Sequence, residues 1–180
     1  MHLIFLLYSA LWLPVSVIQD RKEDEIRWSQ KSELEYSDFK GAVPGNTPWA
    51  ALTASYIYFT YSTTNGKIST FKVYASFKKN ESWMKTARAD VLAHEQLHFA
   101  ITEYFARKLY SDAQQLITQS GNISASANAL FNAVNKECDQ MQETYDAETD
   151  HGVDAVKQEK WRMRVAGLMK QYDPYPETVE

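Results

Sequence analysis

Residues 54–77, ASYIYFTYSTTNGKISTFKVYASF, decide the fold because they contain the clearest strand pattern in the chain. Two runs rich in aromatic and β-branched residues, 54–61 and 68–77, flank the dipeptide Asn65-Gly66. Asn and Gly tolerate the positive φ that both central positions of a tight hairpin turn require. The stretch therefore predicts a β-hairpin, and residues 28–45 before it predict a short strand followed by a loop.

After Ser82 the hydrophobic period changes from that of strands to that of helices. Helices are predicted over about 86–110, over about 124–145, and from Gly152 to the prolines at 174 and 176. Strands followed by helices indicate an α+β fold, here a small hairpin or sheet followed by three helices. The second predicted helix has an apolar face with four-, four-, three- and four-residue spacings, formed by Leu130, Val134, Cys138, Met141 and Tyr145.

Length and composition indicate one globular domain. The chain has 180 residues, of which 44% are hydrophobic and 23% are charged. Its formal net charge is -4, and it has no basic stripe of the kind that binds polyanions, so nucleic acid is excluded as an expected partner. The expected domain covers residues 28–172, with a polar leader at 19–27 and a tail at 173–180.

The N-terminal residues predict export. An apolar run at 3–18 is followed abruptly by charged residues, which is typical of a signal peptide at 1–18. The run is shorter than the roughly 20 residues that a membrane-spanning helix needs. If the signal is cleaved, no stable membrane association is expected. The alternative is an uncleaved membrane anchor formed by residues 3–18.

The predicted helix after Ser82 carries the motif His94-Glu95-Gln96-Leu97-His98, which fits H-E-x-x-H. Residues four apart lie on the same face of a helix, so His94 and His98 can bind one Zn²⁺ ion. Zinc lowers the pKa of a water molecule that it binds, and Glu95 can accept the proton of that water as a general base. The motif therefore predicts a zinc-dependent hydrolase.

A catalytic zinc site needs a third protein ligand besides the two motif histidines. His151 is the only other histidine outside the predicted signal, and it lies in an acidic junction between two predicted helices. We therefore predict His151 as the third ligand, with Glu148, Asp146 and Asp150 as alternatives. Tyr145, just before this junction, is a candidate for stabilising the oxyanion, and a core aromatic residue is the competing interpretation.

Three blocks of sequence support this interpretation by resemblance. They are Asp38-Phe39-Lys40-Gly41, the segment from Ser82-Trp83 through the motif to Leu109, and the segment from Tyr145 to Gly152 followed by Gln158 and Trp161. They resemble a family of uncharacterised bacterial proteins regarded as secreted zinc-dependent proteases. The resemblance covers about residues 28–172 and implies a zincin-like active site with His151 as third ligand. Leu97 departs from the pattern, since a smaller residue often precedes the second histidine.

The leading functional hypothesis is an exported zinc-dependent endopeptidase that hydrolyses amide bonds in peptides or proteins. One alternative is a zinc-binding interaction protein without catalysis, and another is an amidase that acts on cell-wall peptides. Glu95 argues against the first alternative, because a structural zinc site has no use for a general base beside its first histidine.

Overall fold

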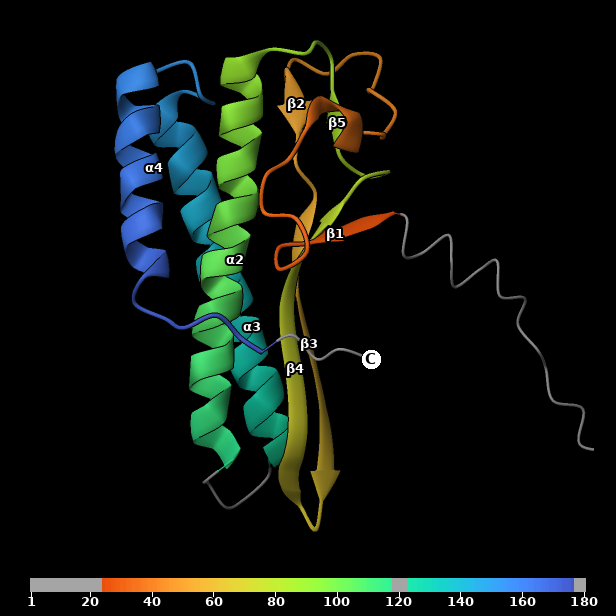
Figure 1. The fold of residues 1–180 in the computed structure, drawn as a ribbon, viewed down its shortest axis with the longest axis vertical. Helices are drawn as coiled ribbons and strands as arrows, with labels where there is room; N and C mark the ends of the chain where they lie inside the picture. The colour runs from red at the N-terminus through yellow and green to blue at the C-terminus, as the bar shows by residue number, and fades with distance from the viewer. Residues whose placement is uncertain (1–23, 118–122, 177–180) are drawn as a thin grey trace, which may run out of the picture.

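The computed structural model describes residues 24–117 and 123–176 (Figure 1). The predicted signal peptide at 1–18 lies outside these residues. No helix in the described part of the chain is long and apolar enough to cross a membrane. The fold is α+β, as predicted, with a small antiparallel sheet and three helices.

The predicted hairpin is confirmed. It consists of β3 (Ser55–Thr64) and β4 (Lys67–Lys78), which pair antiparallel with one register irregularity near Ser62. Asn65 and Gly66 form the turn with φ values of 51° and 73°. Both values are positive, as the turn chemistry of Asn-Gly requires.

A third strand, β1 (Glu25–Arg27), pairs with β4 and gives the sheet order β1-β4-β3. This strand lies in the segment predicted as a polar leader. The segment joins the fold because Ile26 is buried and Glu25 accepts a hydrogen bond from Lys78 at 2.7 Å. The strand predicted within 28–45 is wrong, since that segment contains only a short 3-10 helix, η1 (Tyr36–Asp38).

Two short strands connect the sheet to the helices. β2 (Ala51–Leu52) precedes β3 and pairs with β5 (Trp83–Met84), which follows β4. The amide of Lys85 also donates to the carbonyl of Ala50 at 2.9 Å. These contacts hold β2 beside the chain segment that leads into the first long helix.

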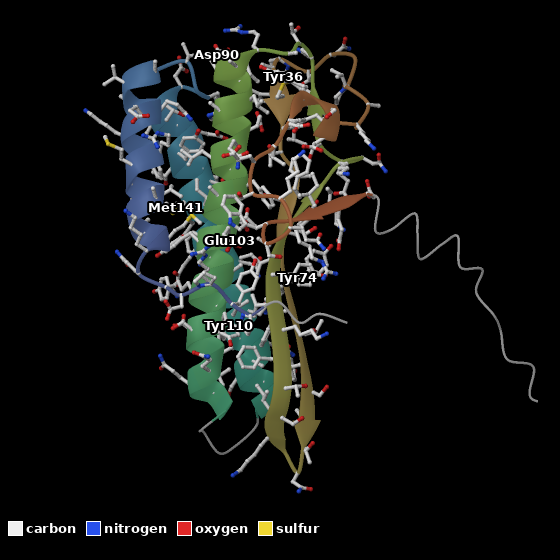
Figure 2. All side chains as sticks on the ribbon, in the orientation of Figure 1. Tyr36, Tyr74, Asp90, Glu103, Tyr110 and Met141 are labelled. Atoms are coloured by element: carbon white, nitrogen blue, oxygen red, sulfur yellow. The ribbon has the colours of Figure 1, made fainter. Side chains whose placement is uncertain are left out.

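The three helices are α2 (Ala89–Ile117), α3 (Ile123–Thr149) and α4 (Ala155–Met169). α2 contacts the sheet as well as α3 and α4, and α3 runs antiparallel to it (Figure 1). Figure 2 shows Asp90 at the upper end of α2, with Glu103 and Tyr110 further down the same helix. α3 is longer than predicted at its C-terminal end, which affects the candidate site.

The core lies where α2 packs against the sheet and the other helices. Phe77 on β4 and Phe99 on α2 are fully buried and in ring contact, with centroids 5.8 Å apart. Gln96, inside the histidine motif, binds the N-terminal segment by accepting from the amide of Leu34 at 2.6 Å and donating to the carbonyl of Ser32 at 2.7 Å. One face of α2 is thereby fixed to the core, while the histidines project from another face.

Candidate metal centre

Two histidines of α2 and one aspartate of α3 meet between these helices. The Nε2 atoms of His94 and His98 are 3.1 Å apart. Asp146 Oδ1 lies 3.1 Å from His94 Nε2 and 3.0 Å from His98 Nε2. This is the one group of three or more potential metal-ligating side chains found among residues 24–117 and 123–176.

Gln142 sets the tautomer of His98. Its amide nitrogen donates to the carbonyl of His98 at 3.0 Å and to Thr102 Oγ1 at 3.2 Å. Its amide oxygen must therefore face His98 Nδ1, which lies 2.6 Å away. Nδ1 therefore donates to Gln142, and Nε2 is the nitrogen that faces Asp146 and His94.

Gln158 on α4 and Tyr145 on α3 orient the His94 ring. His94 Nδ1 lies 3.4 Å from Gln158 Oε1, which also accepts from the Tyr145 hydroxyl at 2.7 Å. The Tyr145 ring stacks on the His94 ring with centroids 4.7 Å apart. Hydrogen bonding of the non-ligating nitrogen is how proteins orient histidines that bind metals.

The electrostatics of the cluster favour a bound cation. Asp146 Oδ1 is buried and has no hydrogen-bond partner among the described residues. Burial raises the pKa of Asp146, but its contacts with the two imidazoles outweigh this and hold that pKa well below the usual range. Burial lowers the pKa of His98, but Asp146 and Glu95 raise it by more, so the net shift is upward. The cluster thus attracts positive charge.

The three ligand atoms are spaced as a zinc site requires. Zinc–ligand bonds of about 2.0–2.1 Å in a tetrahedral arrangement separate neighbouring ligand atoms by about 3.3 Å. The observed separations of 3.0–3.1 Å are close to this value. Two imidazoles and a carboxylate are also an established type of zinc donor set. The residues present therefore fit a zinc ion.

The structure brings Asp146 to the motif histidines and leaves His151 outside the cluster. The His151 side chain is 45% exposed, and its Nδ1 lies 3.8 Å from Asp146 Oδ2. The physical reason is that α3 continues to Thr149, past the predicted end of the helix, so Asp146 stays on the helical face that opposes the histidines. Asp146, one of the predicted alternatives, therefore takes the place of His151 as the candidate third ligand.

A reversal of the chain carries His151 away from the ligand atoms. Asp150, His151 and Gly152 have φ values of 51°, 52° and 83°, which lie in the left-handed region. Thr149 caps this turn, because its hydroxyl accepts from the amide of Gly152 at 3.1 Å. His151 ends against Trp49, with ring centroids 4.3 Å apart.

Gly152 lies directly against His94. A Cβ atom at this position would meet the His94 ring at 2.8–2.9 Å, which is too short for a real contact. Only glycine fits both this close approach and the positive φ without strain. The end of the turn therefore packs against one of the candidate ligand side chains.

The other acidic candidates have different partners or positions. Glu148 accepts a hydrogen bond from Trp161 Nε1 at 2.7 Å, which ties α3 to α4. Asp150 is exposed and lies in the turn. The Tyr145 hydroxyl donates to Gln158 and to the carbonyl of His94, and its ring is fully buried. Tyr145 thus contacts a ligand residue from behind and does not line the cleft on which the histidines open.

Glu95 lies beside the ligand cluster on the wall of this open cleft. The cleft has a volume of about 700 Å³ and is bounded by α2, by residues 49–57, by the C-terminal half of α3 and by the turn after it. The Glu95 side chain is buried, and its carboxylate makes no hydrogen bond to any described residue. His94, His98, Asp146 and His151 line the same cleft.

Gln142 is the functional residue that sequence reasoning missed. Gln142 and Asp146 are four residues apart on α3, as His94 and His98 are on α2. This spacing places both side chains on one face of a helix and is the signal that could have identified them together. Both side chains lie at the edge of the predicted apolar face, since Gln142 follows Cys138 by one turn.

No curated protein and no solved structure gives a significant match to the chain. A family model described as "Bacterial protein of unknown function (DUF922)" matches residues 21–152. The matched region includes β1, the sheet, the histidine motif, Asp146 and the turn that ends at Gly152. This chain belongs to that bacterial family of unknown function.

Proposed function

We propose that this protein is an exported zinc-dependent endopeptidase with a zincin-like active site. The observation that carries the proposal is the position of Glu95, which is buried beside three convergent ligand atoms and has a carboxylate without a described hydrogen-bond partner. A purely structural zinc site would need the ligands but would not need a free carboxylate on the wall of an open cleft.

His94, His98 and Asp146 are the proposed zinc ligands, and Gln142 and Gln158 hold the two imidazoles in the ligating tautomer. Bound zinc supplies Lewis acidity, which makes water a nucleophile near neutral pH. Glu95 holds the proton that the water loses and delivers it to the departing amine nitrogen. Glu95 lines the cleft, so its carboxylate can reach a water molecule held beside the ligand cluster.

His151 is the proposed donor to the developing oxyanion, in place of Tyr145. Its imidazole lies on the cleft wall and is partly exposed, whereas the Tyr145 hydroxyl is bonded behind His94. Loss of one oxyanion donor typically lowers turnover by about 10²–10³-fold. A His151→Gly variant should keep its zinc and lose turnover on this scale, since Gly tolerates the positive φ of this position and has no side-chain donor.

The geometry of the sheet supports an extended peptide as substrate. β3 is the edge strand, and the bond from the Lys78 amide to the Ala54 carbonyl at 2.8 Å fixes which residues face β4. By alternation, the backbone groups of Ser55 and Ile57 face away from β4, and both residues line the cleft. A peptide strand that pairs there gains backbone hydrogen bonds with little side-chain selectivity. Cleavage of cell-wall peptides is the second candidate, and the same assay addresses it.

The test compares zinc-loaded wild-type protein with Glu95→Gln on fluorogenic peptides and on cell-wall peptides. Glu95→Gln should bind zinc like the wild type and lose turnover by about 10²–10⁴-fold, the usual contribution of a general base. Glu137→Gln, an exposed carboxylate on α3 outside the cleft, is the matched control and should keep full activity. Equal turnover of Glu95→Gln and wild type would refute the mechanism, and a zinc-loaded wild type inactive on both substrate sets would favour the non-catalytic alternative.

A further inference from the structure

One end of the cleft exposes apolar side chains from three separate segments. Trp49 lies in the loop before β2, Leu52 lies in β2, and Val153 follows the turn after α3. Their exposed fractions are 47%, 44% and 78%, and all three line the cleft. Apolar side chains that cluster while exposed to solvent indicate a surface that binds an apolar group.

Two of these apolar residues have immediate neighbours that contact residues of the site. Thr53, which follows Leu52, donates from its hydroxyl to the carbonyl of Glu95 at 3.2 Å. Gly152, which precedes Val153, packs directly against the His94 ring. Leu52 therefore lies one residue from a contact with the backbone of Glu95, and Val153 lies one residue from a contact with the His94 ring. The apolar surface adjoins the site where the scissile bond would lie.

Trp49 makes contacts with its own loop and with His151. Its amide donates to Thr47 Oγ1 at 3.3 Å, and its ring packs against His151. Lys85 Nζ in turn donates to the carbonyl of Thr47 at 2.5 Å and anchors the loop to the segment before α2. An aromatic wall that is already ordered loses little conformational entropy when it contacts a ligand.

The charged groups at this end of the cleft neutralise each other, and the opposite end carries several polar side chains. Arg88 and Asp90 form an ion pair with one another and line the cleft near the start of α2. At the other end the lining includes Asn135 and Asp139 from α3 and Thr102 from α2. The end at Trp49 thus offers three exposed apolar side chains, whereas the other end combines polar side chains with the buried residues Ile57 and Cys138.

We propose that Trp49, Leu52 and Val153 form a subsite for a bulky apolar side chain of the substrate, next to the scissile bond. The proposal rests on the proposed function, because it takes an extended peptide as the ligand. It names the residues that determine specificity at one position of that peptide. Aromatic and large aliphatic side chains are accepted there, and small or acidic ones are disfavoured.

The test measures binding, so that it does not depend on turnover. Capped octapeptides that differ only at one central residue (Phe, Ala or Asp) are titrated into zinc-loaded Glu95→Gln protein by calorimetry. Burial of a Phe side chain should make the Phe peptide bind about tenfold or more tighter than the Ala peptide. Adding Trp49→Ala or Leu52→Ala should reduce this ratio to about twofold or less, the scale of an ordinary surface substitution.

Met163→Ala in the same Glu95→Gln background is the matched control, because Met163 is an exposed apolar residue of α4 that does not line the cleft. It should leave the ratio unchanged, and Trp49→Phe should preserve most of it. An equal affinity for the three peptides, or a preference that survives both Trp49→Ala and Leu52→Ala, would overturn the subsite. Selective binding without hydrolysis by the wild type would instead refute the proposed function and leave the subsite standing.

Discussion

The substitution Gly152→Ala tests the contact between the turn after α3 and the proposed ligand His94. Alanine at a φ of +83° costs about 1–2 kcal/mol. Its Cβ would meet the His94 ring at 2.8–2.9 Å, and relief of such overpacking costs a further 1–3 kcal/mol or so. We therefore expect the free energy of unfolding of the zinc-free protein to fall by about 2–5 kcal/mol. Displacement of His94 should also weaken zinc binding by about 10–100-fold.

Gly66→Ala is the matched control for this prediction. Gly66 has a similar φ of +73°, but a Cβ there meets nothing within 4 Å. The control should lose only about 1–2 kcal/mol and should bind zinc like the wild type. Chemical denaturation in the presence of a chelator measures stability, and competition with a zinc-binding dye measures affinity. Equal stability losses in the two variants, with unchanged zinc affinity for Gly152→Ala, would refute the role given to this contact.

Further substitutions test the surroundings of the site. Gln142→Leu should weaken zinc binding by about 10–100-fold in the dye competition, while Gln140→Leu, exposed on the same helix, should not. Tyr145→Phe should lower the free energy of unfolding by about 1–2 kcal/mol and leave the turnover per bound zinc unchanged. A tenfold lower turnover at full zinc occupancy would instead support Tyr145 as the oxyanion donor. Burial raises the pKa of Cys138 to about 12, so a thiol reagent at pH 8 should label the unfolded protein and spare the native one. Burial raises the pKa of Glu25, but Lys78 and Arg27 lower it by more, so the pKa in the folded protein is below the ordinary value of 4.5. The stability that ionised Glu25 contributes is therefore complete above pH 4.5 and is lost as the pH falls through the folded-state pKa. Glu25→Gln should flatten the acid side of a plot of melting temperature against pH.

Local chemistry made the hairpin and the helices predictable. The Asn65-Gly66 turn and the alternating strands around it require no information from distant parts of the chain. The two histidines were predictable for the same reason, since their relation depends on one helix alone. β1 was missed because it has a single buried residue, Ile26, and pairs with the distant strand β4. Hydrophobic periodicity does not reveal such a pairing.

The prediction of the third ligand depended on where α3 ends. Asp146 and His151 are five residues apart, and the apolar pattern of the helix stops at Tyr145. The turn after α3 combines a local hydrogen bond, from the Gly152 amide to Thr149, with the packing of Gly152 against His94, which forms only in the fold. Helix ends are therefore the point at which sequence reasoning left the ligand undecided.

The zinc content of the wild type, Asp146→Ala and His151→Gly, measured after dialysis against buffered zinc, tests the central claim most directly. The proposed ligand set predicts one zinc ion per chain in the wild type and in His151→Gly, and none in Asp146→Ala. Zinc retained by Asp146→Ala and lost by His151→Gly would contradict the ligand set, and a folded wild type that binds no zinc would contradict the metal centre itself.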